Sequence, residues 1–235
     1  MPALIRIVAL SLLACGLADA STSPASPGSS SGRTEFNLQT ATIEDINKAF
    51  DAGALTSEKL VQLYLNRIAA YNTKGPNINA IITLQPKALE IARALDAERK
   101  AKGPRSKLHG IPLVFKDLFD TKDMPTSAGF LPMKTSQPVY DATVVARLRD
   151  AGAIVFAKVN MSDWFGVPKP GDQSTVLGRT SNPYNIDLSP SGSSGGTGAS
   201  VAAAFAQAGL GSETGTSIRV PRPRTVTWAL RPRVA

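Results

Sequence analysis

A run of small residues in the C-terminal part of the sequence most constrains the fold of this chain. Residues 191–198 read Ser-Gly-Ser-Ser-Gly-Gly-Thr-Gly, and an alanine-rich segment follows them as far as Ala208. Taken alone, a glycine- and serine-rich stretch is typical of a flexible, unreactive loop. Its place between Pro190 and an alanine-rich segment disfavours a plain linker. We therefore expect a helix over 198–208 whose small side chains pack closely against a sheet.

Apolar residues in the rest of the chain follow helix and strand periods in alternation. Thr42 and Asp45 suit a capping box at the start of a first helix, which Gly53 ends. Further helices are predicted from Thr56 or Ser57 to Tyr71, from Pro86 to Gly103 and over 142–151, and short strands over 80–84, 113–115 and 154–157. Strands alternating with helices favour one α/β domain with helices on the faces of the sheet.

Three residues with catalytic chemistry follow one another along this pattern. Lys116 ends the apolar run after Gly110-Ile111-Pro112, Ser193 lies in the run of small residues, and Ser217 lies in a second block, Gly-Ser-Glu-Thr-Gly-Thr-Ser-Ile-Arg, over 211–219. By itself, Lys116 would be interpreted as an exposed lysine at a strand end, because exposed lysines are the rule. The two serine blocks favour a catalytic interpretation, since each sets hydroxyls beside backbone N–H groups.

In this order and spacing the three motifs resemble the amidase signature family, from about Thr42 to Pro221. The segments 158–164 and 182–184 resemble two further motifs of that family. The resemblance implies a mixed sheet flanked by helices and a Ser-cisSer-Lys triad. Ser217 would be the nucleophile, Ser193 the proton-relaying cis-serine and Lys116 the base.

The resemblance also implies supporting roles around this triad. Backbone N–H groups of Thr214, Gly215 and Thr216, together with that of Ser217, would surround the oxyanion and the substrate. From its place in the loop, we expect Ser194 to support that loop by hydrogen bonding. The implied reaction is hydrolysis of a small or peptide-like carboxamide. Such a reaction needs an activated nucleophile, a proton donor for the leaving amine and donors for the oxyanion.

The proposed base must lose its charge before it can accept a proton. An unperturbed lysine has a pKa of ~10.4 and is charged at neutral pH. Burial in a closed pocket disfavours the ammonium, and a lowering of about three units corresponds to roughly 4 kcal/mol. Because a carboxylate facing the amine would oppose this shift, we expect Asp117 to be directed away from Lys116.

Other interpretations of the same residues are weaker. Residues 192–196 fit the Gly-x-Ser-x-Gly pattern of α/β-hydrolases with Ser194 as nucleophile, but that fold needs a histidine after the serine, and the one histidine, His109, precedes it. The glycines lack the Gly-Lys-Ser/Thr ending of a phosphate-binding loop.

Three departures from the family pattern stand out. Ser191 replaces a usual glycine, which the loop tolerates if its φ is negative, and Thr216 replaces a glycine before the nucleophile, which is costly if φ there is positive. The chain also stops eighteen residues after Ser217, earlier than family members do. We therefore expect an incomplete amidase-signature fold, either an amidase or a catalytically inactive fragment of one.

The expected organisation is a signal peptide over 1–20, a Ser/Pro/Gly-rich linker over 21–35, the N-terminal half of an amidase-signature domain over 36–221, and an atypical Arg/Pro-rich tail over 222–235. The tail differs from the small, apolar sequence usual after the serine block. A local frame disturbance with early termination would produce it.

Composition excludes several function classes. The net charge is +8, but four of these charges are arginines in the last fourteen residues, and no basic face interleaved with aromatics appears elsewhere, so we expect no nucleic-acid partner. The single cysteine, Cys15, and the single histidine offer neither a disulfide nor a zinc cluster. We expect no metal and no cofactor.

The N-terminal sequence is typical of export. Arg6 precedes an apolar stretch over 7–17 that is too short to span a bilayer, and Ala18-Asp19-Ala20 offers a cleavage site. We expect an exported chain, periplasmic or secreted, without a transmembrane helix in its mature form. Export argues against a role in the transamidosome, which works in the cytoplasm beside tRNA. The alternative is a bacterial lipoprotein anchored to the membrane by a lipid at Cys15.

Overall fold

The computed structural model describes residues 37–166, 173–225 and 227. The chain divides into two units, Met1–Glu35 and Phe36–Ala235, and the elements below all belong to the second. The predicted signal segment, the linker and Cys15 lie outside the described residues, as does most of the tail.

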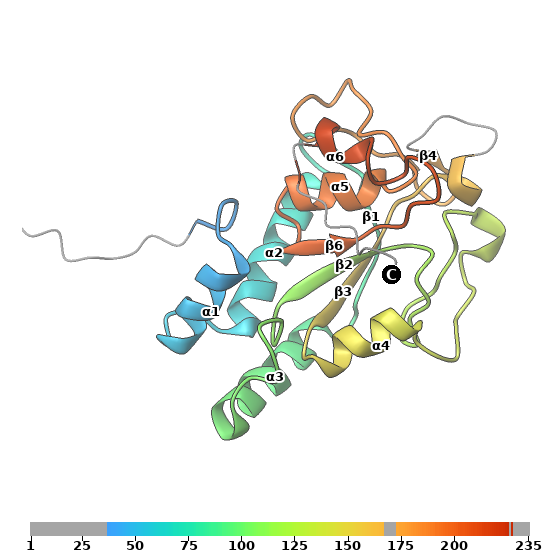
Figure 1. Ribbon diagram of the computed structural model, residues 1–235. Helices are drawn as coiled ribbons and strands as arrows, with labels where there is room; N and C mark the ends of the chain where they lie inside the picture. The colour runs from blue at the N-terminus through green and yellow to red at the C-terminus, as the bar shows by residue number, and fades with distance from the viewer. Residues whose placement is uncertain (1–36, 167–172, 226, 228–235) are drawn as a thin grey trace, which may run out of the picture. The chain divides into compact units, whose positions relative to one another are not determined.

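A four-stranded mixed sheet forms the centre of this second unit (Figure 1). It contains β1 (Ile81–Leu84), β2 (Pro112–Lys116), β3 (Ile154–Val159) and β6 (Ala208–Leu210), in the order β1-β3-β2-β6. β2 runs parallel to both β3 and β6, whereas β1 is antiparallel to β3. Every residue of β2 and β3 is buried, as expected of parallel strands covered on both faces.

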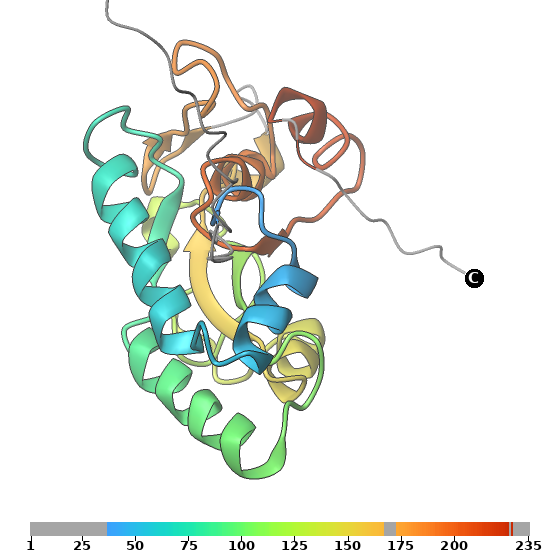
Figure 2. The same ribbon diagram turned by 90° about the vertical axis from the view of Figure 1, so that its left-hand side faces the viewer.

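Helices flank the sheet, which confirms the predicted fold class. They are α1 (Ile43–Asp51), α2 (Ser57–Tyr71), α3 (Ala88–Lys102), α4 (Thr143–Asp150), α5 (Gly195–Ala202) and α6 (Pro221–Arg224). α5 packs against β2 and β6, while α3 and α4 pack against β3. Figure 2 shows α2 and α3 along the same side of the strands, and these two helices pack on each other.

Short elements complete the described part of the chain. Two single-turn 3-10 helices occupy Leu131–Met133 and Asp163–Gly166, and a two-stranded ribbon joins β4 (Gln173–Ser174) to β5 (Gly178–Arg179). The core lies between the sheet and its helices, where the ring of Tyr64 from α2 packs 6.4 Å, centroid to centroid, from that of Phe156 in β3.

Local signals at the helix starts are confirmed in one case and wrong in another. The Thr42 hydroxyl accepts from the Asp45 N–H at 3.1 Å and the Asp45 carboxylate accepts from the Thr42 N–H at 2.9 Å, which is the predicted capping box. The prediction that Pro86 opens α3 is wrong, because Pro86 lies in a turn and the helix begins at Ala88. The turn forms because the Ala88 N–H donates back to the Gln85 carbonyl at 3.1 Å.

The predicted helix over 198–208 is wrong in both bounds. α5 begins at Gly195 and ends at Ala202, the chain then turns through Ala204 with a φ of 51°, and Ala208 already belongs to β6. The intrinsic helix propensity of alanine is high, so the alanine-rich composition predicts a helix as far as Ala208. The tertiary pairing of β6 with β2 overrides that propensity, and composition cannot reveal this pairing.

Candidate active site

Lys116 is the last residue of β2 and its side chain is fully buried. Its Nζ lies 2.7 Å from Ser193 Oγ, 3.0 Å from Ser212 Oγ and 3.4 Å from the Ser212 carbonyl. Burial lowers the pKa of Lys116 from its ordinary value of 10.5 to about 7, because the ammonium loses its hydration. At neutral pH a large fraction of this amine is therefore uncharged and able to accept a proton.

Ser193 lies just before α5, in the turn that the run of small residues forms. The Gly192–Ser193 peptide bond is cis. The Ser162 N–H donates to the Ser193 carbonyl at 3.4 Å, and the Gly196 N–H donates to the Asn160 carbonyl at 3.1 Å. These bonds attach the serine turn to the segment that leaves β3.

One glycine of the 191–198 run is required by close packing at the start of α5. A Cβ built on Gly196 would lie 2.2 Å from the Asn160 carbonyl oxygen, a distance that non-bonded atoms do not reach. Glycine is therefore the residue that lets the start of α5 approach the backbone beyond β3.

Ser217 reaches Ser193 from the loop between β6 and α6. Ser193 Oγ and Ser217 Oγ are 2.9 Å apart, so the three side chains form one hydrogen-bonded series from Lys116 through Ser193 to Ser217. The backbone reinforces this contact, because the Ser194 N–H donates to the Ser217 carbonyl at 3.1 Å. The three residues predicted from the sequence to be catalytic thus come together from β2, the turn before α5 and the 211–219 loop.

Ser194 joins the two serine-bearing loops, and its hydroxyl is not directed at the series from Lys116 to Ser217. Its Oγ donates to the Ser212 carbonyl at 3.1 Å and accepts from the Ser212 N–H at 3.3 Å. His109 lies on the segment before β2, where its Nδ1 accepts from the Arg105 N–H and its Nε2 contacts the Leu95 carbonyl. The contacts of Ser194 and His109 therefore do not favour a Ser-His pair of the α/β-hydrolase kind.

The backbone around Ser217 offers donors at the surface. Among the described residues, the N–H groups of Thr214, Gly215, Thr216 and Ser217 have no protein acceptor, and residues 214–216 are exposed. Glu213 stabilises this loop. Its carboxylate accepts hydrogen bonds from the N–H groups of Ile218 and Arg219 at 2.9 and 2.8 Å and forms an ion pair with the Arg219 guanidinium. Such free donors beside a hydroxyl are suited to stabilising a developing oxyanion.

Sequence reasoning missed Ser212 and the function of Glu213. The hydroxyl and carbonyl oxygens of Ser212 both contact the Lys116 amine. Glu213 binds the backbone of Ile218, directly after the candidate nucleophile Ser217. A hydroxyl residue followed directly by an acidic one, within the same small-residue block as Ser217, is the signal that could have identified both.

Asp117 faces Lys158 and Ser127, as the expectation for Lys116 requires. Asp117 Oδ1 lies 3.2 Å from Lys158 Nζ, and Asp117 Oδ2 accepts from the hydroxyl and N–H of Ser127 and from the Gly129 N–H. Both carboxylate oxygens are thus engaged away from Lys116 and the two serines.

The two substitutions within the serine blocks differ in their backbone cost. Ser191 has a φ of 65°, so it occupies the left-handed region that favours glycine, contrary to the condition under which the loop would tolerate it. Thr216 is not among the non-glycine residues with positive φ in the described part of the chain, so the expected cost does not arise there.

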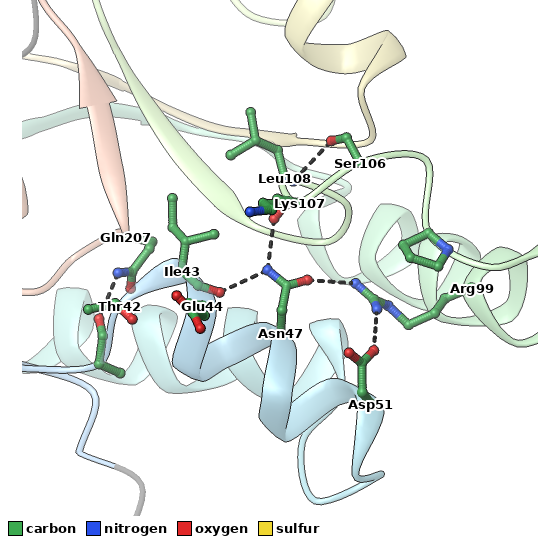
Figure 3. A pocket seen from close by; sticks show the side chains of 12 residues that line it. Thr42, Ile43, Glu44, Asn47, Asp51, Arg99, Ser106, Lys107, Leu108 and Gln207 are labelled. Atoms are coloured by element: carbon green, nitrogen blue, oxygen red, sulfur yellow. Dashed lines mark hydrogen bonds and ion pairs between the residues drawn. The ribbon is translucent and has the colours of Figure 1, made fainter.

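A separate pocket of about 990 Å³ lies between α1, the 104–108 segment and Gln207 (Figure 3). Its polar groups are hydrogen-bonded to one another: Asn47 Nδ2 donates to the backbone carbonyl of Lys107 at 2.9 Å, and the Arg99 guanidinium donates to the side-chain oxygens of Asn47 and Asp51. None of Lys116, Ser193 and Ser217 lines it. Over the described ranges, no three or more potential metal-ligating side chains gather, and no helix is long and apolar enough to cross a membrane.

Comparison with known proteins identifies similar sequences and folds. A family model described as Amidase matches residues 59–233. A probable amidase of Arabidopsis thaliana is 39% identical over 207 residues, covering 85% of this chain and 40% of that protein. One subunit of the glutamyl-tRNA(Gln) amidotransferase of an Azoarcus species is 39% identical over 193 residues, covering 82% of this chain and 38% of that protein.

A solved structure extends this likeness to three dimensions. The native peptide amidase from Stenotrophomonas maltophilia superposes with a TM-score of 0.75 at 43% identity, over 77% of this chain and 38% of that one. The chain thus spans about two fifths of the length of the relatives it matches.

Proposed function

This chain belongs to the amidase family, and from that premise we propose that it is an amide hydrolase whose substrate is a small or peptide-like carboxamide. The observation that carries the proposal is the series of contacts from Lys116 through Ser193 to Ser217, at 2.7 and 2.9 Å. A serine hydroxyl attacks an amide only when a base takes its proton, and this series connects such a base to a hydroxyl at the surface loop.

In the proposed reaction, Ser217 Oγ attacks the carbonyl carbon and passes its proton to Ser193 Oγ. The Ser193 proton passes in turn to the uncharged Nζ of Lys116. The N–H groups of residues 214–217 donate hydrogen bonds to the negatively charged carbonyl oxygen and stabilise it. The ammonium of Lys116 then returns a proton along the same path to the leaving amine, and water releases the acyl group from Ser217.

Similarity to a peptide amidase supports a carboxamide as substrate, and it is the reason to test peptide amides first. A second candidate is a polypeptide with part of the amidase fold and no hydrolase activity by itself. One observation favours this alternative: residues 214–216, whose N–H groups would bind the oxyanion, are exposed.

A fluorophosphonate probe, which labels activated serines, distinguishes the two candidates. We expect labelling of the full chain that is lost in Ser217→Ala and in Lys116→Met. Ser181→Ala is the matched control, because Ser181 is a partly exposed serine whose N–H pairs with the Ile78 carbonyl, outside the series from Lys116 to Ser217. A folded chain that stays unlabelled would refute the hydrolase, and release of ammonia from a C-terminally amidated dipeptide would identify the substrate class.

We also propose that the chain is exported, because residues 1–20 have the charge, apolar stretch and small residues of a signal peptide. Lipidation at Cys15 is the alternative form of the same proposal.

A further inference from the structure

A buried ion pair lies next to the proposed base and takes no part in the proposed proton path. Asp117 follows Lys116 directly, and its carboxylate lies 3.2 Å from Lys158 Nζ, with the two side chains 1% and 0% exposed. Such a pair is costly to bury, because both charges lose their hydration. Nothing in the series from Lys116 to Ser217 requires it.

The strand geometry explains why the pair and the base do not touch. β2 and β3 are parallel, with Phe115 paired to Lys158 and Lys116 paired to Val159, and the Asp117 N–H continues the ladder to the Val159 carbonyl at 3.1 Å. Successive side chains along a strand point to opposite faces. Lys116 therefore faces the serines, while Asp117 and Lys158 meet on the other face of the same two strands.

The pair is also the anchor of the segment 125–129. Lys158 Nζ donates to Thr126 Oγ1 at 2.7 Å and to the Pro125 carbonyl at 3.1 Å. On the carboxylate side, Asp117 Oδ2 accepts from the N–H groups of Ser127 and Gly129, at 3.2 and 3.3 Å. Hydrogen bonds to the segment 125–129 thus fix the positions of both Lys158 Nζ and the Asp117 carboxylate.

We propose that the Asp117–Lys158 pair positions the proposed base and neutralises the charge beside it. The pair fixes the end of β2, and the Lys158 cation neutralises the Asp117 carboxylate, so that this carboxylate does not stabilise the ammonium of Lys116. The proposal rests on the proposed function in assigning Lys116 as the base. Asp117 and Lys158 contact neither substrate nor reacting atoms, so both are positioning residues.

Two other charged groups on the surrounding elements are already paired. Glu213, on the loop that carries Ser217, binds Arg219. Asp123, whose charge, together with that of Asp120, raises the pKa of Lys158, binds Arg149 at 3.0 Å. Burial lowers the pKa of Lys158 while the Asp117 carboxylate opposes that shift, in keeping with a cation that depends on its partner.

The proposal predicts opposite effects for the two halves of the pair. In Lys158→Met the Asp117 carboxylate keeps its three hydrogen-bond donors and loses its cationic partner. It then favours the ammonium of Lys116, so the titration of Lys116 moves to higher pH by about one unit. In Asp117→Asn no carboxylate remains, so the titration moves to lower pH or stays where it is. The double variant Asp117→Asn/Lys158→Met returns it close to the wild-type position.

The titration of Lys116 is read in two ways on the full chain. Nuclear magnetic resonance of isotope-labelled lysine Cε, assigned with Lys116→Met, follows its proton directly, and the pH dependence of fluorophosphonate labelling follows its effect on Ser217. Lys48→Met, which removes a lysine from the exposed surface of α1, is the control for loss of a positive charge. Circular dichroism establishes that each variant is folded.

An upward shift in Asp117→Asn, or a wild-type titration in folded Lys158→Met, would overturn the proposal. If Lys158→Met does not fold, the proposal is tested by the direction of the Lys116 titration shift in Asp117→Asn and by the pH at which Lys116 titrates in the double variant. The expected shift of the lysine resonance without any serine labelling would instead refute the hydrolase. It would leave standing only the electrostatic part of the inference, which is that Lys158 neutralises the carboxylate next to Lys116.

Discussion

Replacing Lys116 by methionine should make the chain more stable than the wild type in mild acid, and this gain should diminish as the pH rises. The pKa of Lys116 falls from 10.5 to about 7 on folding, because burial removes the hydration of the ammonium. Between these two values the unfolded chain binds more protons than the folded one, so the stability of the wild type rises with pH. Below the folded-state pKa of about 7, Lys116 is charged in both states, and the wild type carries the full free-energy cost of burying the ammonium.

The magnitude follows from the two pKa values. The shift from 10.5 to about 7 corresponds to roughly 5 kcal/mol below neutral pH. Losing the contacts of Nζ with Ser193 and Ser212 costs about 1–2 kcal/mol, so Lys116→Met should exceed the wild type by about 3 kcal/mol near pH 6. This difference should shrink by roughly 2.5 kcal/mol between about pH 6 and pH 9.

Urea unfolding followed by far-ultraviolet circular dichroism measures this difference at each pH. Lys158 and the acidic groups titrate in both proteins, so their contributions cancel in the comparison. Val114→Ala, an uncharged change in the fully buried centre of β2, is the control and should destabilise equally at every pH. A stability difference between Lys116→Met and the wild type that stays constant from acid to base would refute the buried, uncharged lysine.

Four further outcomes are expected. Ser191→Gly should stabilise the chain by about 1 kcal/mol, measured by urea unfolding, because Ser191 has a φ of 65°. Gly196→Ala should prevent folding or abolish serine labelling, since its Cβ would lie 2.2 Å from the Asn160 carbonyl oxygen; normal labelling would show that the contact can relax. Thr42→Ala should cost about 1 kcal/mol of unfolding free energy through loss of the α1 cap, whereas an unchanged midpoint would contradict the capping box. Intact-mass measurement of the exported chain should give an N-terminus near Ser21, and a lipid-modified mass would support the alternative.

Much of the fold could be predicted from local pattern. The capping box at Thr42, the helix ending at Tyr71 and the buried runs of β2 and β3 are all encoded within a few neighbouring residues. The strand β6 could not be predicted, because three residues at the end of an alanine-rich segment carry no periodic signal and become a strand only beside β2. The predicted start of α3 was also wrong, since a turn at Pro86 competes with the first helical turn.

The candidate site divides in the same way. The sequence alone identified Lys116, Ser193 and Ser217 as candidates, because the blocks that contain them resemble the motifs of the amidase signature family in order and spacing. Only the tertiary structure decided that they touch, since they come from segments far apart in the chain.

Burial and pairing were likewise beyond the sequence. The lowered pKa of Lys116, the contact of Ser212 with its amine and the pairing of Asp117 with Lys158 depend on which face of a strand a side chain leaves and on what packs against that face. Residue types and their spacing determine which chemistry is on offer. Desolvation and distance, which exist only once the strands and loops have come together, determine whether that chemistry can act.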